Sequence, residues 1–145
     1  MIKFLYIINK QGVLRLSRYF QHMGLKERNQ LQTSIIRSVM ERSDKQRCLA
    51  QLQTEGPTIV YRKYVSLYMI SAVTPDENEL AVLELMQNIL ETLDQYFQKV
   101  TEVDIVSNTE RVHMVLDEMI VNGYVGETSK VRVLVPLQLL DAAKK

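Results

Sequence analysis

MIKFLYIINKQGVLRLSRYF, residues 1–20, is the stretch that decides the fold, because its apolar pattern is typical of a β-hairpin. Residues 1–9 are almost entirely apolar apart from Lys3, as expected of a strand that is buried on both faces. Lys10-Gln11-Gly12 then supplies a short polar connection, and its glycine can adopt positive φ at little cost. Apolar residues return from Leu14 onward with polar residues between them, so we expect a half-exposed second strand.

The composition fits one globular domain, which we expect to span residues 1–145. A chain of 145 residues can bury roughly 70% of the surface that it exposes when unfolded. Its 46% hydrophobic content supports a substantial core, and 24% charged residues is ordinary for a globular protein. The formal net charge is only +1, from 18 basic and 17 acidic residues. No overall field therefore draws the chain to nucleic acid or to anionic lipid.

Cysteine usage and the apolar pattern favour a cytosolic protein. Cys48 is the single cysteine, so no internal disulfide can form, as is usual in a reducing compartment. No apolar run approaches the roughly 18 residues that a membrane-spanning helix needs. The apolar start is too short for a signal core and should contribute to the fold, so we expect no cleaved leader. We expect any contact with membranes to be made through partners.

The middle of the chain predicts one helix and three further strands. Residues 26–42 carry apolar side chains at helical spacing and should form an amphipathic helix. Strands are expected over residues 47–54, 58–65 and 67–73. With the opening hairpin they make five strands, which we expect to pair in one antiparallel sheet.

The second half of the chain predicts helices. Thr74 is expected to cap a long helix that continues to about Val100, with Pro75 in its first turn and Glu77 completing a capping box. A second helix should cover residues 109–121 and end at Asn122-Gly123 in a left-handed cap.

The C-terminal region has a less regular pattern. Residues 129–141 should form a short helix that is broken or kinked near Pro136, because proline lacks a backbone N–H. The expected order is β-β-α-β-β-β-α-α plus this C-terminal helical segment. We therefore predict an α+β fold with a five-stranded antiparallel sheet flanked by helices.

Residues that commonly carry out chemistry do not form an active-site pattern in this sequence. His22 and His113 lie on different elements, without carboxylate or thiolate neighbours at metal-ligand spacing. Asp117 and Glu118 are adjacent on a helix, so their side chains diverge. Cys48 has no neighbouring base and is expected to be a small core residue. We expect neither enzymatic activity nor a cofactor or metal.

Several motifs nevertheless occur in a specific order along the whole chain. They are MIKF, NKQG and RLSRYF, then IVYRKYVSLY, ENELAVLELMQNILETLDQYF, VTEVDIVSN and RVHMVLDEMIVNG followed by ET. This series closely resembles the small (sigma) subunits of clathrin-adaptor-type complexes. NKQG, RLS, VH followed by LDEM, and the tail pairs Pro136-Leu137 and Leu140-Asp141 look most like the sigma subunit of the fourth adaptor complex.

The resemblance implies a longin-like fold and a non-enzymatic role in vesicle-mediated protein transport. It implies a cytosolic heterotetramer with two large subunits, one of which contacts the sigma subunit directly, and a medium subunit. The complex would lie peripherally on Golgi, trans-Golgi or endosomal membranes and select transmembrane cargo. An alternative is another longin-like trafficking subunit, such as the small coat subunit of Golgi retrograde vesicles. A longin domain of a fusion protein would need a C-terminal heptad helix and anchor, which we do not expect here.

The resemblance also implies a site for the acidic dileucine signal, in which an acidic residue lies four positions before a Leu-Leu or Leu-Ile pair. Such a peptide needs an apolar slot for two side chains and a cation for the carboxylate. The cation maps to Arg15. In the family, an arginine of the large subunit shares the role of binding the acidic residue. The slot maps to five apolar residues, which are Val65, Leu67, Leu90, Val100 and Val103. Leu67 and Leu90 would equally suit the core, and Arg15 would equally suit a solvated strand position.

Two positions depart from the family pattern. Val65 is larger than the alanine often found there, which would narrow the slot. Lys99 replaces a polar amide, and its charge makes it a further candidate to contact the acidic residue.

Overall fold

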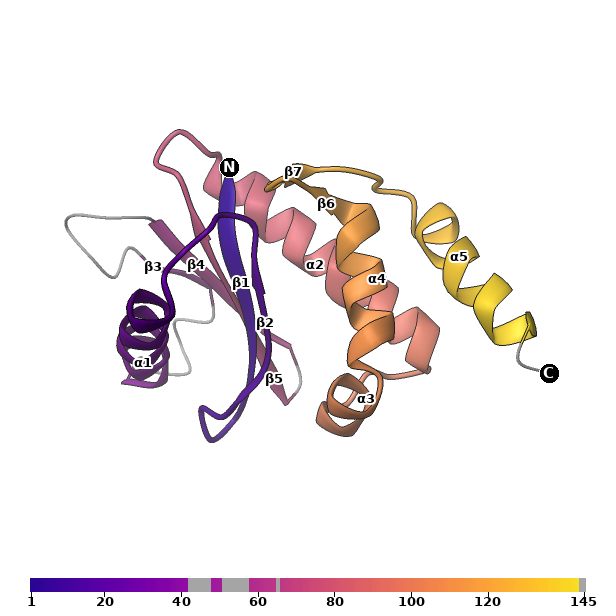
Figure 1. Cartoon of the computed structure of the whole chain (residues 1–145), viewed down its shortest axis with the longest axis horizontal. Helices are drawn as coiled ribbons and strands as arrows, with labels where there is room; N and C mark the ends of the chain where they lie inside the picture. Colours follow the sequence, from indigo (N-terminus) through magenta and orange to yellow (C-terminus); the bar gives the residue numbers. More distant parts are fainter. Residues whose placement is uncertain (42–47, 51–57, 65, 144–145) are drawn as a thin grey trace.

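The computed structural model describes residues 1–41, 48–50, 58–64 and 66–143, with the backbone alone for 48–50. Figure 1 shows the arrangement of its elements. In chain order they are β1 (Ile2–Asn9), β2 (Leu14–Tyr19), α1 (Leu25–Glu41), β3 (Cys48–Ala50), β4 (Thr58–Tyr64), β5 (Leu67–Val73), α2 (Glu79–Phe97), α3 (Glu102–Ser107), α4 (Thr109–Met119), β6 (Ile120–Val121), β7 (Tyr124–Val125) and α5 (Lys130–Ala143).

The main sheet of the described residues has five antiparallel strands in the order β2-β1-β5-β4-β3. Helix α1 covers one face, and α2 with α4 and α5 lies on the other side (Figure 1). The predicted α+β fold is confirmed, as is the opening hairpin with its buried first strand and half-exposed second strand. Of the strand expected over residues 47–54, the described part is β3, and the side chain of Cys48 lies outside the described set.

Both faces of β1 are buried because its side chains alternate between two apolar clusters. Leu5 and Ile7 belong to the cluster that includes α2, α4 and α5, whereas Phe4, Tyr6 and Ile8 belong to the cluster beneath α1. Each fully buried side chain of this size contributes roughly 1.5–3 kcal/mol to folding. The apolar run at the start of the chain thus joins the two halves of the core.

The long helix α2 begins at Glu79, so the prediction that Thr74 caps it is wrong. Asn78 is the cap, because its side chain accepts hydrogen bonds from the backbone N–H groups of Leu80 and Ala81. Thr74 instead closes a preceding turn, in which its carbonyl accepts from the Glu77 N–H at 3.1 Å.

Asn122 and Gly123 have positive φ, of 52° and 85°, but they do not cap a helix as predicted. Helix α4 ends at Met119, and the two residues form the turn of the β6–β7 hairpin, where both central positions favour positive φ. Gly123 is also required by space, because a Cβ there would lie 2.6 Å from the Ile2 carbonyl oxygen.

The C-terminal helix α5 continues through Pro136, so the chain does not break there, whereas a kink at the proline stays a prediction. Val133 and Leu134 before the proline and Leu137 after it are buried in the core. Their packing outweighs the loss of one backbone hydrogen bond. The sequence reasoning also missed α3, a six-residue helix between the two predicted ones.

Candidate functional site

Arg15 lies at an irregularity of β2 that turns its side chain toward the helical layer. The pairing register changes from Ile7 opposite Leu16 to Ile8 opposite Leu14, so it steps over Arg15. Leu14 and Leu16 consequently pack on opposite faces of the sheet although they are two positions apart. Such bulges commonly redirect a side chain near a functional site.

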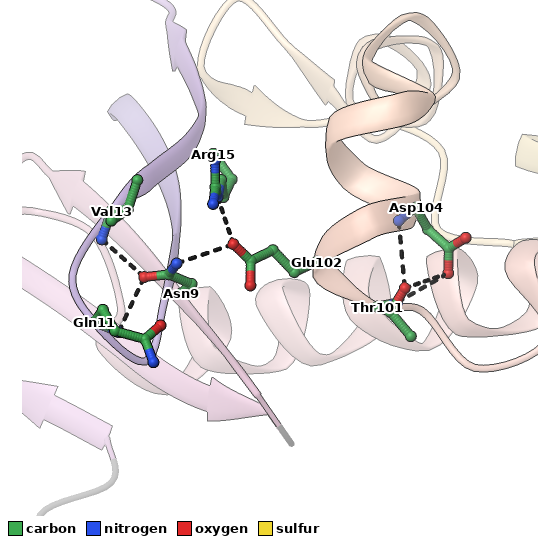
Figure 2. A network of polar contacts seen from close by, with 7 residues as sticks. All are labelled: Asn9, Gln11, Val13, Arg15, Thr101, Glu102 and Asp104. Carbon is green, nitrogen blue, oxygen red and sulfur yellow. Dashed lines mark hydrogen bonds and ion pairs between the residues drawn. The ribbon is translucent and has the colours of Figure 1, made fainter.

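Helix α3 brings an acidic residue to Arg15. Thr101 caps this helix, and its hydroxyl accepts the backbone N–H of Asp104 at 3.3 Å. The Asp104 carboxylate in turn accepts the backbone N–H of Thr101 at 3.0 Å, which completes a capping box. Because the cap defines where the helix starts, it places Glu102 in the first turn, facing β2 (Figure 2).

Glu102 Oε1 is the acceptor for two side chains from the opening hairpin (Figure 2). The Arg15 Nε donates to it at 2.5 Å, and the Asn9 Nδ2 donates at 2.9 Å. Asn9 is 5% exposed, and its Oδ1 accepts the backbone N–H groups of Gln11 and Val13 at 3.0 and 2.8 Å. The hairpin turn therefore holds Asn9, and Asn9 holds the carboxylate.

The charges of this network favour an ionised Glu102. The hydrogen bond from Asn9, and then that from Arg15, lowers the pKa of the Glu102 carboxyl below its usual value. The side chains of Arg15 and Glu102 are 35% and 32% exposed, so solvent reaches both partners of the ion pair. An exposed pair of this kind contributes little to stability, in general about 0.2–1 kcal/mol.

Three of the five residues predicted for the dileucine slot are buried together in the core. Leu67 and Leu90 are 1% exposed and Val100 is 6% exposed, and all three belong to the cluster on the helical side of the sheet. Leu67 also lies opposite Asn9 in the pairing of β1 with β5. The structure thus places Leu67 beside Asn9 of the Arg15 network and buries all three residues in one closed cluster.

The other predicted residues differ in their surroundings. Val103 is 70% exposed on α3, next to Glu102 in the chain. Lys99 is exposed, with φ of 87°, and its backbone N–H donates to the Asp94 carbonyl at 3.0 Å. Val65 lies outside the described residues.

The turn between α2 and α3 holds Val100 through a contact with the end of α2. Gln98 and Lys99 both have positive φ, of 57° and 87°, a conformation that side chains with a Cβ rarely adopt. The Asp94 carboxylate accepts the Val100 backbone N–H at 2.9 Å. The phenol of Tyr64, at the end of β4, has a raised pKa because of its burial and its proximity to Asp94.

His113, which the sequence places on a helix without metal-ligating neighbours, contacts the side chain of Arg18 across the helix–sheet interface. Its Nδ1 lies 3.2 Å from the Arg18 Nη1, and Arg18 also forms an ion pair with Asp117. Burial, and then the charge of Arg18, lowers the pKa of His113.

In the described ranges, no group of three or more His, Cys, Asp or Glu residues is placed to hold a metal ion. Among the helices described, none is both long and apolar enough to cross a bilayer.

Sequence reasoning missed Glu102 and Asn9, although one local signal was present. Thr101 and Asp104 have the spacing of a capping box, which would have predicted α3 and placed Glu102 in its first turn. The pairing of Glu102 with Arg15 has no such signal, because 87 positions separate the two residues.

Comparison with known proteins agrees with the resemblance of the motifs. A family model for the clathrin adaptor complex small chain matches residues 1–144. The AP-4 complex subunit sigma-1 of Homo sapiens is 41% identical over 141 residues, which cover 97% of this chain and 96% of that protein. The AP-4 complex subunit sigma of Arabidopsis thaliana is 42% identical over 142 residues, 98% of each chain. The AP-1 complex subunit sigma-1A of Homo sapiens is 35% identical and covers 97% of this chain and 88% of its own.

A solved structure has the same fold. One chain of a homology model of the full-length AP-3 complex in a stretched open conformation superposes with a TM-score of 0.77. The two chains are 28% identical, and the match covers 99% of this chain and 95% of the other. The similarity therefore extends over the sheet and over the helices on both of its sides.

Proposed function

Since this chain belongs to the family of clathrin adaptor complex small chains, we propose that it recognises acidic dileucine signals in cargo tails. Family membership makes it a small subunit of an adaptor complex in vesicle-mediated protein transport. The proposal adds a ligand to that role. The observation that carries it is that Arg15 holds a carboxylate, that of Glu102, with its Nε.

The proposed site provides the cation that the signal requires. The guanidinium of Arg15 has further N–H donors beyond Nε and is 35% exposed, so a carboxylate from outside can reach it. The bulge in β2 supports this assignment, because it turns Arg15 toward the same side of the sheet as Leu67 and Val100. Lys99, which is exposed and directly precedes Val100, would add positive charge at the edge of the proposed site.

The proposed slot for the two leucines consists of Val65, Leu67, Leu90, Val100 and Val103. Leu67, Leu90 and Val100 are buried in one apolar cluster, so part of that cluster would have to open before a ligand could reach them. The turn before Val100 would serve as the hinge of this opening, and the positive φ of Gln98 and Lys99 supports that proposal. Burial of two leucine side chains contributes roughly 3–6 kcal/mol before the costs of ordering and opening. We expect weak binding that several contacts on one membrane reinforce.

We further propose which subunits this chain binds and on which membranes the complex lies. The chain would join a heterotetramer of the AP-4 type and contact one large subunit directly. An apolar stripe on α5 supports a partner, because Val131, Val135 and Leu139 recur every four residues and are 69%, 43% and 66% exposed. The complex would hold the chain at Golgi, trans-Golgi or endosomal membranes and on transport vesicles. The chain would act there by binding and not by catalysis.

The test is peptide binding to the assembled adaptor core that contains this chain. A peptide with glutamate four positions before Leu-Leu should bind, and replacement of either that glutamate or the Leu-Leu pair by alanine should weaken binding. Arg15→Glu should abolish the preference for the glutamate peptide. Arg37→Glu is the matched control, because Arg37 is exposed on α1, on the other face of the sheet. Equal binding of all peptides, or equal effects of the two variants, would refute the proposal.

A further inference from the structure

We propose that Glu102 is an intramolecular competitor for Arg15, and that this competition sets the affinity of the subunit for acidic cargo signals. The inference rests on the proposed function, because it concerns the same arginine. Glu102 has the chemistry of the acidic residue in the signal, a carboxylate that accepts a hydrogen bond from a guanidinium. It already holds that position, with its Oε1 2.5 Å from the Arg15 Nε.

The ion pair with Glu102 reduces both the positive charge and the number of free N–H donors that Arg15 presents to a ligand. The charges of Arg15 and Glu102 cancel at close range, so an incoming carboxylate is attracted by the arginine and repelled by the glutamate. It can form its full set of hydrogen bonds with the guanidinium only if the Nε contact is also released. Both effects lower the affinity for an acidic peptide and leave the affinity for the apolar pair unchanged.

The contacts around the pair indicate that Arg15, and not Glu102, is the side chain that changes position when a ligand binds. The Glu102 carboxylate also accepts a hydrogen bond from the Asn9 Nδ2 at 2.9 Å. Asn9 is itself 5% exposed, and its Oδ1 accepts two backbone N–H groups, so its position is fixed. The capping box of Thr101 and Asp104 fixes the start of α3. Glu102 therefore keeps one hydrogen bond when Arg15 leaves, and the long arginine side chain is the part that exchanges between the internal and the external carboxylate.

A different role for Glu102 makes the opposite prediction. If the carboxylate merely positioned Arg15, its removal would disorder the guanidinium and weaken binding of acidic peptides. The chain permits a separation of the two roles. Glu102→Gln removes the charge but keeps an oxygen that accepts from Arg15 and Asn9. Glu102→Ala removes the charge and the acceptor together.

The test is a titration of the assembled adaptor core with the two peptides that carry glutamate or alanine four positions before Leu-Leu. Glu102→Gln should bind the glutamate peptide roughly two- to fivefold more tightly than the unmodified core, the range expected for an exposed ion pair. The alanine peptide should bind both cores equally. The gain should shrink at high salt, because solvent-exposed charges are screened. Glu110→Gln is the control, since Glu110 is an exposed carboxylate in the first turn of α4.

The outcomes separate this inference from the function on which it rests. If the unmodified core prefers the glutamate peptide and Glu102→Gln leaves that preference equal or smaller, the competition is refuted and the proposed function stands. If no core prefers the glutamate peptide, the proposed function fails, and the competition fails with it. A gain in Glu102→Gln together with a loss in Glu102→Ala still supports competition, with an added positioning role for the oxygen.

Discussion

The carboxylate of Asp94 accepts the backbone N–H of Val100 at 2.9 Å, across the turn that joins α2 to α3. The carbonyl of the same residue accepts the N–H of Lys99 at 3.0 Å. Asp94, in the last turn of α2, thus fixes the backbone of the turn through two hydrogen bonds. The position of Glu102 opposite Arg15 depends on this turn, because α3 begins two residues after Val100.

Asp94→Ala is therefore expected to destabilise the fold. The variant leaves the Val100 N–H, which is partly buried, without its acceptor, so the free energy of unfolding should fall by about 1–2 kcal/mol. Asp94→Asn keeps an oxygen at the same place and should lose less. Urea denaturation of the three chains measures both effects, and equal stability of the alanine and asparagine variants would contradict the role of the acceptor.

Lys99→Gly is expected to stabilise the same turn. Lys99 has φ of 87°, which costs a residue with a Cβ about 1 kcal/mol but costs glycine little. Relief of this strain should raise the midpoint of thermal unfolding. Gln95→Gly is the contrasting control, because Gln95 is exposed within α2, where glycine is unfavourable by about 1 kcal/mol. A loss of stability in both variants would show that the backbone at Lys99 is not strained.

His113 should make stability depend on pH below neutrality. Burial and Arg18 lower its pKa, so between the folded value and the usual value near 6.5 the unfolded chain binds the proton more readily. Its contribution is complete above about pH 6.5 and is lost as the pH falls through the lowered pKa. Asp117 opposes the shift but is the weaker influence.

Denaturation midpoints between pH 7 and pH 5 test this prediction. They should fall less in His113→Gln than in the unmodified chain, because glutamine does not titrate. His22→Gln should keep the full decline, since His22 is exposed. Identical pH profiles for all three chains would exclude His113 as the cause.

Tyr96 links α2 to the C-terminal helix. Its hydroxyl donates to the Asp141 Oδ2 at 2.6 Å, and the Asp141 Oδ1 lies 3.2 Å from the buried guanidinium of Arg111. Tyr96→Phe should lower the free energy of unfolding by about 1 kcal/mol, because the carboxylate is 45% exposed and water replaces part of the contact. Tyr124→Phe, at a tyrosine that is 58% exposed, should change stability by less than about 0.5 kcal/mol. Equal effects of the two substitutions would contradict the link.

The regular elements were predictable where one local pattern dominated. The apolar run of β1 and the helical spacing of α1 and α2 identified these elements, since burial requires a period of about 2 or about 3.6 residues. The boundary of α2 was missed because Thr74 and Asn78 are both good caps. Pro136 misled the reasoning about α5, because packing on both sides outweighs a local preference.

The candidate site was predictable only in part. The motifs assign Arg15 and the apolar slot through resemblance alone. The burial of Leu67, Leu90 and Val100 in one cluster required the packed structure. The same apolar residues would suit a core or an open slot equally well, because hydrophobicity alone does not state which neighbour covers a side chain.

The sequence by itself determined the opening hairpin, the long helices, the α+β class and the family, because these depend on local periodicity and on ordered motifs. Only the tertiary structure decided that Arg15 and Asn9 both meet the carboxylate of Glu102. The reason is physical. Contacts between residues 87 or more positions apart arise when the strand register, the bulge in β2 and the cap of α3 place their side chains together.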